Sequence, residues 1–270
     1  PNVERTDLEP DPGLADLGAF VGKGHILPAA LLPPDLYVTE ALPTPMSTAQ
    51  QRLPVKALVF DCEGRTVAEH RFGALPRDHR EALDVSALAR GRLNTPFGHV
   101  ELVYDFDAGT DADGWLHALF RYRNRASGHA AETSFGSHMF NSALTYRGEP
   151  QSYGGPPPGL STRLFLRVAP QPWRTFCHLI YPVSQAWHAH SQTALSLRGA
   201  AGEEIARAEM RIPASGSRLW RVQDVFDEAL LARAGPHPYI VVRDESCRLF
   251  GYHGVEGGHG SFSLDHMFGF

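Results

Sequence analysis

Gly128 to Phe140 reads GHAAETSFGSHMF, and Gly258 to Phe268 reads GHGSFSLDHMF. Each stretch contains a Gly-His pair, then Ser-Phe, then His-Met-Phe. Elements shared in the same order indicate an internal repeat, and a repeat decides how a chain is divided. Similar hairpin composition in two unrelated strands is the alternative explanation. We predict from this pattern that the chain contains two related units in tandem.

Two further matches upstream keep the same order. The sequence LFRY at 119–122 corresponds to LFGY at 249–252. Before them, VELVYD ends at Asp105 and YIVVRD ends at Asp244. Matches that recur in order, separated only by differences of loop length, favour duplication over chance.

The composition suits a folded β protein. Of 270 residues, 43% are hydrophobic and 20% are charged, with 26 glycines and 21 prolines, a content typical of short strands joined by turns. The net charge of −5 provides no electrostatic reason to expect nucleic acid. No apolar run approaches the roughly 20 residues that a membrane-spanning helix needs. Three widely spaced cysteines favour a reducing, cytoplasmic compartment, although the compartment stays open.

The chain divides into four predicted segments. Residues 1–50 are a proline-rich arm, 51–153 the first β-sandwich, 154–159 (GGPPPG) a linker, and 160–270 the second β-sandwich. We expect two tandem homologous antiparallel β-sandwich domains, jelly-roll-like, in a pseudo-twofold arrangement. Each has one short helix, at 84–91 and 224–235. The strands are predicted at 55–61, 66–72, 100–106, 116–123, 133–146, 164–168, 176–180, 193–197, 204–212, 239–243, 248–252 and 262–268.

Histidines in the repeated stretches are the first candidate site. If the two copies face each other, the stretches bring together one carboxylate and four imidazoles, from Glu132, His129, His138, His259 and His266. Such a set suits one transition metal, either zinc, iron or copper. Glu132, His138 and His266 are the predicted catalytic residues. The alternative is that these histidines only hold strand ends through hydrogen bonds.

Two other patterns suggest binding. His188 and His190 would share one face of a strand and are further candidate metal ligands, or simply a polar strand face. Arg121, Arg123 and Arg125 alternate in the same way and would bind an anionic group of a substrate, or form a solvated face.

Motifs of the common enzyme classes, such as GxSxG, HExxH and Walker A, do not occur, and the chain resembles no family that we recognise. The leading hypothesis is a metal-dependent enzyme for a small organic substrate, with its site near the face between the repeats. The alternative is a non-catalytic module that binds carbohydrate or a protein partner, with tryptophans stacking on sugar rings. A third is an assembly protein that forms oligomers through the N-terminal arm. The tryptophans are Trp115, Trp173, Trp187 and Trp220.

Overall fold

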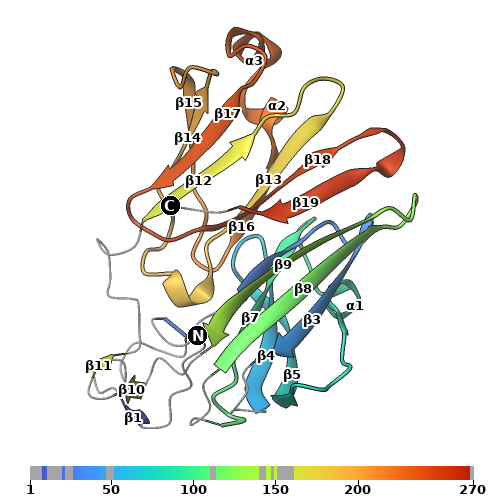
Figure 1. Ribbon diagram of the computed structural model, residues 1–270, viewed down its shortest axis with the longest axis vertical. Coiled ribbons are helices and arrows are strands. Elements are labelled where there is room, and N and C mark those ends of the chain that lie inside the picture. Colours follow the sequence, from blue (N-terminus) through green and yellow to red (C-terminus); the bar gives the residue numbers. More distant parts are fainter. Residues whose placement is uncertain are drawn as a thin grey trace.

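The computed structural model describes residues 8–10, 20–21, 27–46, 52–109, 114–139, 144–146, 149–150 and 161–267. The fold is mostly β, as predicted, and consists chiefly of four antiparallel sheets of four strands each (Figure 1). Within these residues, no helix is both long and apolar enough to cross a membrane. A small additional sheet contains β1 (Leu8–Pro10), β10 (Leu144–Tyr146) and β11 (Glu149–Pro150).

The first unit is a sandwich of two sheets. Sheet I contains, in spatial order, β2 (Leu27–Leu31), β7 (Gly98–Tyr104), β4 (Arg52–Asp61) and β5 (Thr66–Pro76). Sheet II contains β6 (Leu83–Asp84), β3 (Tyr37–Pro45), β8 (Gly114–Asn124) and β9 (Ala130–Met139). Helix α1 (Val85–Ala89) follows β6, and the Asp84 side chain caps it by accepting a hydrogen bond from the Ala87 N–H at 2.8 Å.

The second unit is built in the same way. Sheet III contains β12 (Thr162–Arg167), β17 (Tyr239–Asp244), β14 (Thr193–Arg198) and β15 (Glu204–Met210). Sheet IV contains β16 (Ser217–Arg221), β13 (Arg174–Ile180), β18 (Phe250–Glu256) and β19 (Phe262–His266). The single predicted helix at 224–235 is two helices, α2 (Val222–Val225) and α3 (Glu228–Arg233). Two short 3₁₀ turns are η2 (Val183–Gln185) and η3 (Gly258–Gly260).

Both units have the same strand order. With the strands numbered within each unit, sheets I and III both run first, sixth, third, fourth, and sheets II and IV both run fifth, second, seventh, eighth. A helix follows the fifth strand in each unit. This agreement supports the prediction of two related units. Neither the tandem duplication nor the jelly-roll part of the prediction is confirmed.

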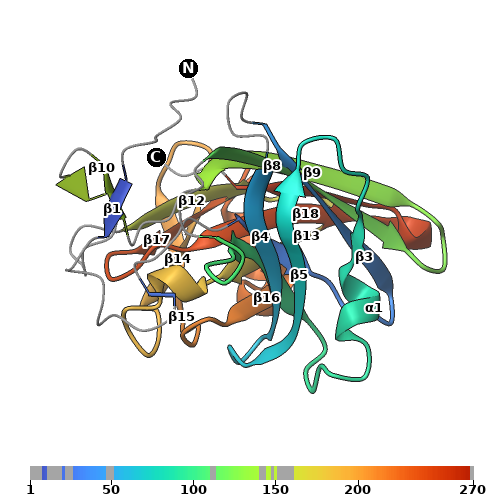
Figure 2. The ribbon, with the colours of Figure 1, turned by 90° about the horizontal axis from the view of Figure 1, so that it is seen from below.

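Sheet IV is a middle layer that serves two hydrophobic cores. Along β13, Phe176 and Ile180 belong to the core of the first unit, whereas Cys177 and Leu179 belong to the core of the second unit. Alternate residues of a strand point to opposite faces, so a strand that serves two cores must be buried along nearly its whole length. Six consecutive residues of β13 are indeed buried. The core of the first unit is therefore completed by residues of sheet IV, which lies behind sheet I in the view from below (Figure 2).

The packing of the units is not two-fold symmetric. Strand β9 contacts its equivalent β19, but β13 and β18 contact β2, and β16 contacts β7. A two-fold axis would require the reciprocal contacts of β12 with β3 and β8, and of β17 with β6. Those pairs are not among the main contacts of the described residues, so the expected pseudo-twofold arrangement is wrong.

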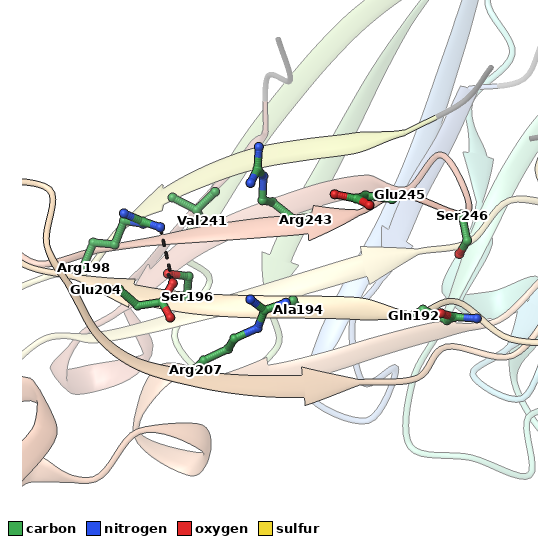
Figure 3. Close-up of a pocket in the computed structure, with 10 residues that line it drawn as sticks. All are labelled: Gln192, Ala194, Ser196, Arg198, Glu204, Arg207, Val241, Arg243, Glu245 and Ser246. Carbon is green, nitrogen blue, oxygen red and sulfur yellow. Dashed lines mark hydrogen bonds and ion pairs between the residues drawn. The ribbon is translucent and has the colours of Figure 1, made fainter. Parts of the chain in front are cut away.

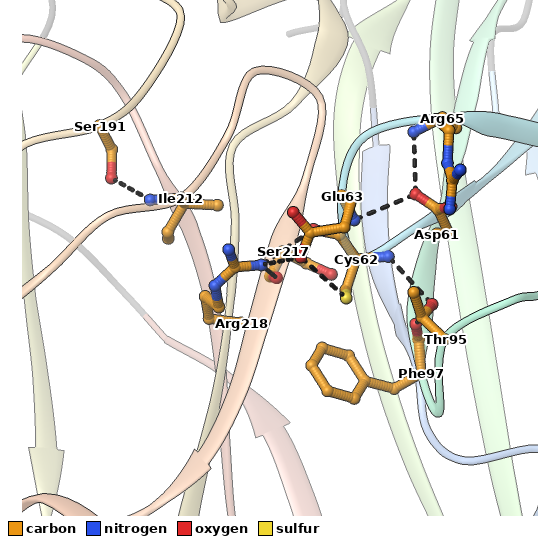
Figure 4. Close-up of polar contacts among 10 residues, drawn as sticks. All are labelled: Asp61, Cys62, Glu63, Arg65, Thr95, Phe97, Ser191, Ile212, Ser217 and Arg218. Carbon is orange, nitrogen blue, oxygen red and sulfur yellow. Dashed lines mark hydrogen bonds and ion pairs between the residues drawn. The ribbon is translucent and has the colours of Figure 1, made fainter.

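Hydrogen bonds connect the units at the edges of this interior. The Tyr252 hydroxyl donates to the Pro28 carbonyl at 2.6 Å in a buried position. The Ser217 N–H donates to the Cys62 carbonyl at 3.0 Å, and the Arg218 guanidinium donates to the same carbonyl at 3.1 Å (Figure 4). Gly64 has a φ of +87°, and a Cβ there would lie 2.1 Å from the Ala214 oxygen, so only glycine fits this turn.

Two predicted segments differ from the structure or lie outside it. Strands β2 and β3 fall within residues 1–50, for which the sequence predicts an arm, and they pair with β7 and β8 of the first unit. Their apolar residues are buried, so this part of the segment belongs to the sandwich. The predicted linker at 154–159 lies outside the described residues.

We expect Tyr252→Phe to lower the free energy of unfolding by about 1–3 kcal/mol, because the variant leaves a buried carbonyl without its donor while it preserves the ring. Urea unfolding monitored by circular dichroism measures the change. Tyr239→Phe is the matched control, since that tyrosine is only half-buried and its hydroxyl has no hydrogen-bond partner among the described residues. Equal stability of both variants would contradict this role for Tyr252.

Candidate functional site

The two repeated stretches do lie side by side. The Thr133 hydroxyl in β9 donates to Asp265 Oδ1 in β19 at 3.2 Å and accepts from the His266 N–H, also at 3.2 Å. The His266 ring stacks on Phe135, with 5.2 Å between ring centroids. Its Nδ1 lies 3.5 Å from Asp265 Oδ1. His266 therefore takes part in the contact between the units.

The other predicted metal ligands are not gathered around His266. His129 and His259 are exposed in turns, and Glu132 pairs with Arg121, with 2.6 Å between Oε1 and Nε. Among the described residues, no group of three or more His, Cys, Asp or Glu side chains is arranged to hold a metal ion. The side chain of His138 lies outside this description, so its role as a ligand stays a prediction.

The predicted histidine pair is not on a strand. His188 and His190 lie in an irregular segment after η2, where His190 forms only an isolated bridge with Pro213. The same-face argument requires an extended strand with its period of two, and it fails here. The exposed His188 donates its backbone N–H to the Tyr181 hydroxyl at 3.1 Å.

The predicted arginine row is interrupted. Arg121 is paired with Glu132 and lies 3.9 Å from Glu40, and these carboxylates hold the pKa of its guanidinium above the ordinary value. Arg125 follows the end of β8 and donates to the Pro34 carbonyl at 2.8 Å. Arg123 alone remains exposed on the strand without an ion pair among the described residues. The three guanidiniums therefore do not form one anion site.

The four tryptophans are also dispersed. Trp173 is 45% exposed, while Trp220 is buried, and Trp115 and Trp187 are partly buried. A groove of several exposed tryptophans, which the carbohydrate hypothesis would use for stacking, is not formed by the described residues.

A buried polar cluster lies between the units. His99 Nε2 is 2.9 Å from Glu101 Oε1, and both side chains are fully buried on the outer face of sheet I. Glu101 also accepts the Val183 N–H of η2 at 3.0 Å. His178 of β13 lies edge-on to Phe97 of the first unit, and neither of its ring nitrogens has a hydrogen-bond partner within the described ranges.

This cluster was not predicted as a group. A sequence signal existed, because His99 and Glu101 alternate within a strand that is otherwise apolar. Burial lowers the pKa of His178 to about 3, and the neighbouring His99 adds to the shift. The imidazole of His178 is therefore neutral across the physiological pH range.

The candidate site is a cleft between the units, which we name the inter-unit cleft. Its walls come from the segment between β2 and β3, from the start of β3, from the residue preceding β7, and from β13, β16, α2 and β18. The cleft has a volume of about 280 Å³. Its apolar walls include Leu36, Tyr37, Phe97, Leu219 and Trp220.

Three charged groups converge at the inter-unit cleft. Arg221 donates from Nε and Nη2 to the two oxygens of Glu256, at 2.9 and 3.1 Å. This fork raises the pKa of the guanidinium. Asp224 accepts the Arg221 N–H at 3.2 Å. The cleft therefore presents fixed donors and fixed acceptors next to one another.

Tyr37 connects the charged groups to the apolar wall. Its ring contacts Phe262 edge-on at 5.1 Å, so its position is set by residues of both units. Burial, aided by the Glu256 carboxylate, raises the pKa of its hydroxyl. The phenol stays protonated and keeps its capacity to donate a hydrogen bond.

Comparisons with known proteins do not place the chain in a family. No protein-family model matches it, and no curated protein does. Among solved structures, a lectin from Pleurotus ostreatus in complex with GalNAc has 8% identity and a TM-score of 0.17, over 97% of this chain and 84% of that one. The apo form of a Pleurotus ostreatus lectin has 8% identity and a TM-score of 0.18, over 90% and 83%. Similarities this low identify neither the fold nor the function of this chain.

The buried His178 predicts a specific pH dependence of stability. Its folded-state pKa of about 3 lies below the ordinary 6.5, so the unfolded chain takes up this proton first as the pH falls. The contribution of neutral His178 is complete above about pH 6.5 and is lost progressively toward pH 3. We expect the free energy of unfolding to fall more steeply in the wild type than in His178→Phe, by up to about 1.4 kcal/mol per pH unit.

Urea unfolding between pH 7.5 and 4.5 gives both slopes. His190→Phe is the control, because this histidine is exposed and should leave the slope unchanged. Identical slopes for the wild type and His178→Phe would show that His178 does not control the dependence.

Proposed function

We propose that this protein is a non-catalytic binding module that holds one neutral sugar residue in the inter-unit cleft. The observation that carries the proposal is the position of the Arg221–Glu256 pair beside the aromatic and aliphatic wall. Small-ligand sites are typically apolar pockets with a few well-placed polar groups. The cleft volume of about 280 Å³ is near the lower end of the usual range of about 300–1,000 Å³, which suits a single ring.

The charges select a neutral ligand with many hydroxyl groups. A sugar hydroxyl both donates and accepts, so one ring can accept from Arg221 and donate to Glu256 and Asp224. An anion would be repelled by the two carboxylates, and the pairing of Glu256 with Arg221 reduces the attraction of the cleft for a cation. The C–H face of a sugar ring would pack against Tyr37 and Leu36, as amphipathic ligands do on aromatic side chains.

Binding is favoured over hydrolysis by the hydrogen bonds that Glu256 accepts. Glycosidases need one protonated carboxyl group as a general acid. Both side-chain oxygens of Glu256 already accept hydrogen bonds from Arg221, at 2.9 and 3.1 Å, so neither is placed to protonate a leaving group. The pair is thus suited to orienting a ligand.

We also infer that the two units are repeats that arose by duplication. The repeated stretches fall on η3 with β19 and on β9 with the turn before it, and β9 and β19 are the eighth strands of their units. The sequence repeat and the strand order thus identify the same strand, the eighth, in both units. The cleft uses non-equivalent surfaces of the two units, which is consistent with a single cleft of this kind per chain.

Titration calorimetry and ¹H–¹⁵N chemical-shift mapping with a panel of neutral hexoses and N-acetylhexosamines test the sugar proposal. We expect one sugar to bind with a dissociation constant of about 1 mM or lower, and shifts confined to residues around the cleft. Arg221→Ala removes a charged hydrogen-bond donor and should weaken binding at least about tenfold.

Two further variants sharpen the result. Leu36→Ser removes an apolar side chain that is 58% exposed, so it should weaken binding with little effect on folding. Arg233→Ala, in the last turn of α3, removes an exposed arginine away from the cleft and should bind normally. Binding that survives both Arg221→Ala and Leu36→Ser would exclude the cleft as the site.

A further inference from the structure

A second surface with the character of a binding site lies on the outer face of sheet III (Figure 3). It is a trench of about 410 Å³ that follows β14. Its floor is made of small or neutral side chains, Gln192, Ala194 and Ser196. We name this surface the β14 trench. It shares no residue with the inter-unit cleft.

Arginines form both walls of the β14 trench. Arg207 extends from β15 toward the floor, and Arg243 rises from β17 on the other side (Figure 3). In the sheet register, Arg243 lies opposite Ala194 and Arg207 lies opposite Ser196. The short floor residues leave an open space between the two guanidiniums.

These two arginines are not neutralised. Among the described residues, neither forms an ion pair with a carboxylate. Two glutamates line the trench, and Glu245 forms no ion pair with either arginine among the described residues. Glu204 accepts from Ser196 Oγ at 2.6 Å and from Arg198 Nη2 at 3.3 Å. The Glu204 carboxylate is therefore paired at one end of the trench and does not neutralise Arg207 or Arg243.

The strand register places two arginines opposite each other, which lowers the stability of the sheet. Arg243 is the direct cross-strand partner of Arg163 in β12. Like charges directly opposite each other in a sheet are destabilising. Arg163 is turned over the Phe165 ring, at 5.3 Å from its centroid, which leaves the repulsion without a carboxylate to offset it. Such a local conflict is typical of functional surfaces.

The excess positive charge is local. The outer face of sheet III carries five arginines against three glutamates, whereas the whole chain has a net charge of −5. The arginines are Arg163, Arg167, Arg198, Arg207 and Arg243, and the glutamates are Glu204, Glu209 and Glu245. A positive patch on an acidic protein attracts anions to that patch alone.

We propose that the β14 trench binds an acidic oligosaccharide, with a carboxylate or sulfate group held between Arg207 and Arg243. Guanidiniums suit both oxyanions, because their planar fork donates two parallel hydrogen bonds. Gln192 and the Ser196 hydroxyl on the floor are placed to hydrogen-bond sugar hydroxyls on either side of the charged group.

The sheet geometry favours a sugar chain over an acidic peptide. Strand β14 is paired on both sides, with β15 and β17, so its backbone has no free edge. An extended peptide gains most of its affinity by adding to an exposed edge, and a trench over a central strand does not offer one. The hydroxyls of an oligosaccharide need only side-chain partners.

Nucleic acid is disfavoured by the trench floor. Single-stranded nucleic acids bind largely through bases stacked on aromatic side chains. The floor of the β14 trench holds no aromatic residue among the described residues that line it. A nucleic acid would also be repelled by the net charge of the chain.

Titration calorimetry at low salt, with the full chain, tests the proposal. The probes are a galacturonate tetramer, a sulfated oligosaccharide of similar length, an uncharged glucose tetramer, inorganic sulfate and a poly-glutamate peptide. We expect one or both acidic oligosaccharides to bind, with affinity that falls as salt is raised, and the uncharged tetramer not to bind. The two acidic sugars distinguish a carboxylate from a sulfate ligand.

The double variant Arg207→Gln, Arg243→Gln should reduce this affinity at least about tenfold, since each arginine contributes a charge-assisted contact. Arg80→Gln, an exposed arginine of the first unit without an ion pair among the described residues, should bind like the wild type. Arg221→Ala in the inter-unit cleft should also retain acidic-sugar binding, so failure of one site is distinguishable from failure of the other.

Thermal unfolding provides a readout independent of ligand. Arg243→Gln removes the repulsion with Arg163, so its Tm should equal or exceed that of the wild type. A lowered Tm would show that Arg243 is structural and would overturn the proposal. It would equally be overturned by unchanged affinity in the double variant, by binding of sulfate alone, by preferential binding of the peptide, or by no binding of either acidic sugar.

Discussion

The structure depends on the burial of sheet IV on both faces. Side chains alternate along β13, and Phe176 enters one core while Cys177 enters the other. Removing apolar surface from water is the main favourable term in folding, and here a single strand contributes it to two units at once. The two units are therefore not independent domains, because neither core is complete without β13 and its neighbours. The Tyr252–Pro28 hydrogen bond and the Gly64 turn then set the alignment of the units.

This shared layer also determines where polar groups are costly and where they are useful. His178 shares the face of β13 that meets the first unit, and its neighbours leave it dehydrated. At the rim of the same layer, the side chains of Arg221 and Glu256 stay partly exposed to water and pair with each other. Buried charges need partners, whereas pairs at a rim keep enough hydration to exchange with a ligand. The inter-unit cleft lies at this boundary between apolar wall and charged rim.

The strands of sheet III make none of the main contacts with the first unit among the described residues. The outer face of this sheet is therefore not required to be apolar. Sheet III is the one sheet of the second unit that carries a row of unpaired guanidiniums among the described residues. A half-buried antiparallel sheet normally alternates apolar and polar residues, and this alternation places arginines outward at Arg163, Arg243 and Arg207. The cross-strand pairing of Arg163 with Arg243 is visible only once the register is known.

The sequence by itself determined the β class, most strand positions and the correspondence between the two stretches at 128–140 and 258–268, because alternation and turn residues are local signals. It also located the short helix that begins after Asp84. Tertiary structure decided which residues meet. His188 and His190 were expected on a strand and lie in bends, and Arg121 was expected to bind a ligand and binds Glu132. The cleft residues Tyr37, Arg221 and Glu256 come from three separated segments, and the two arginines of the β14 trench from two. Such sets are joined by sheet order and register, which depend on long-range packing and leave no local trace in the sequence.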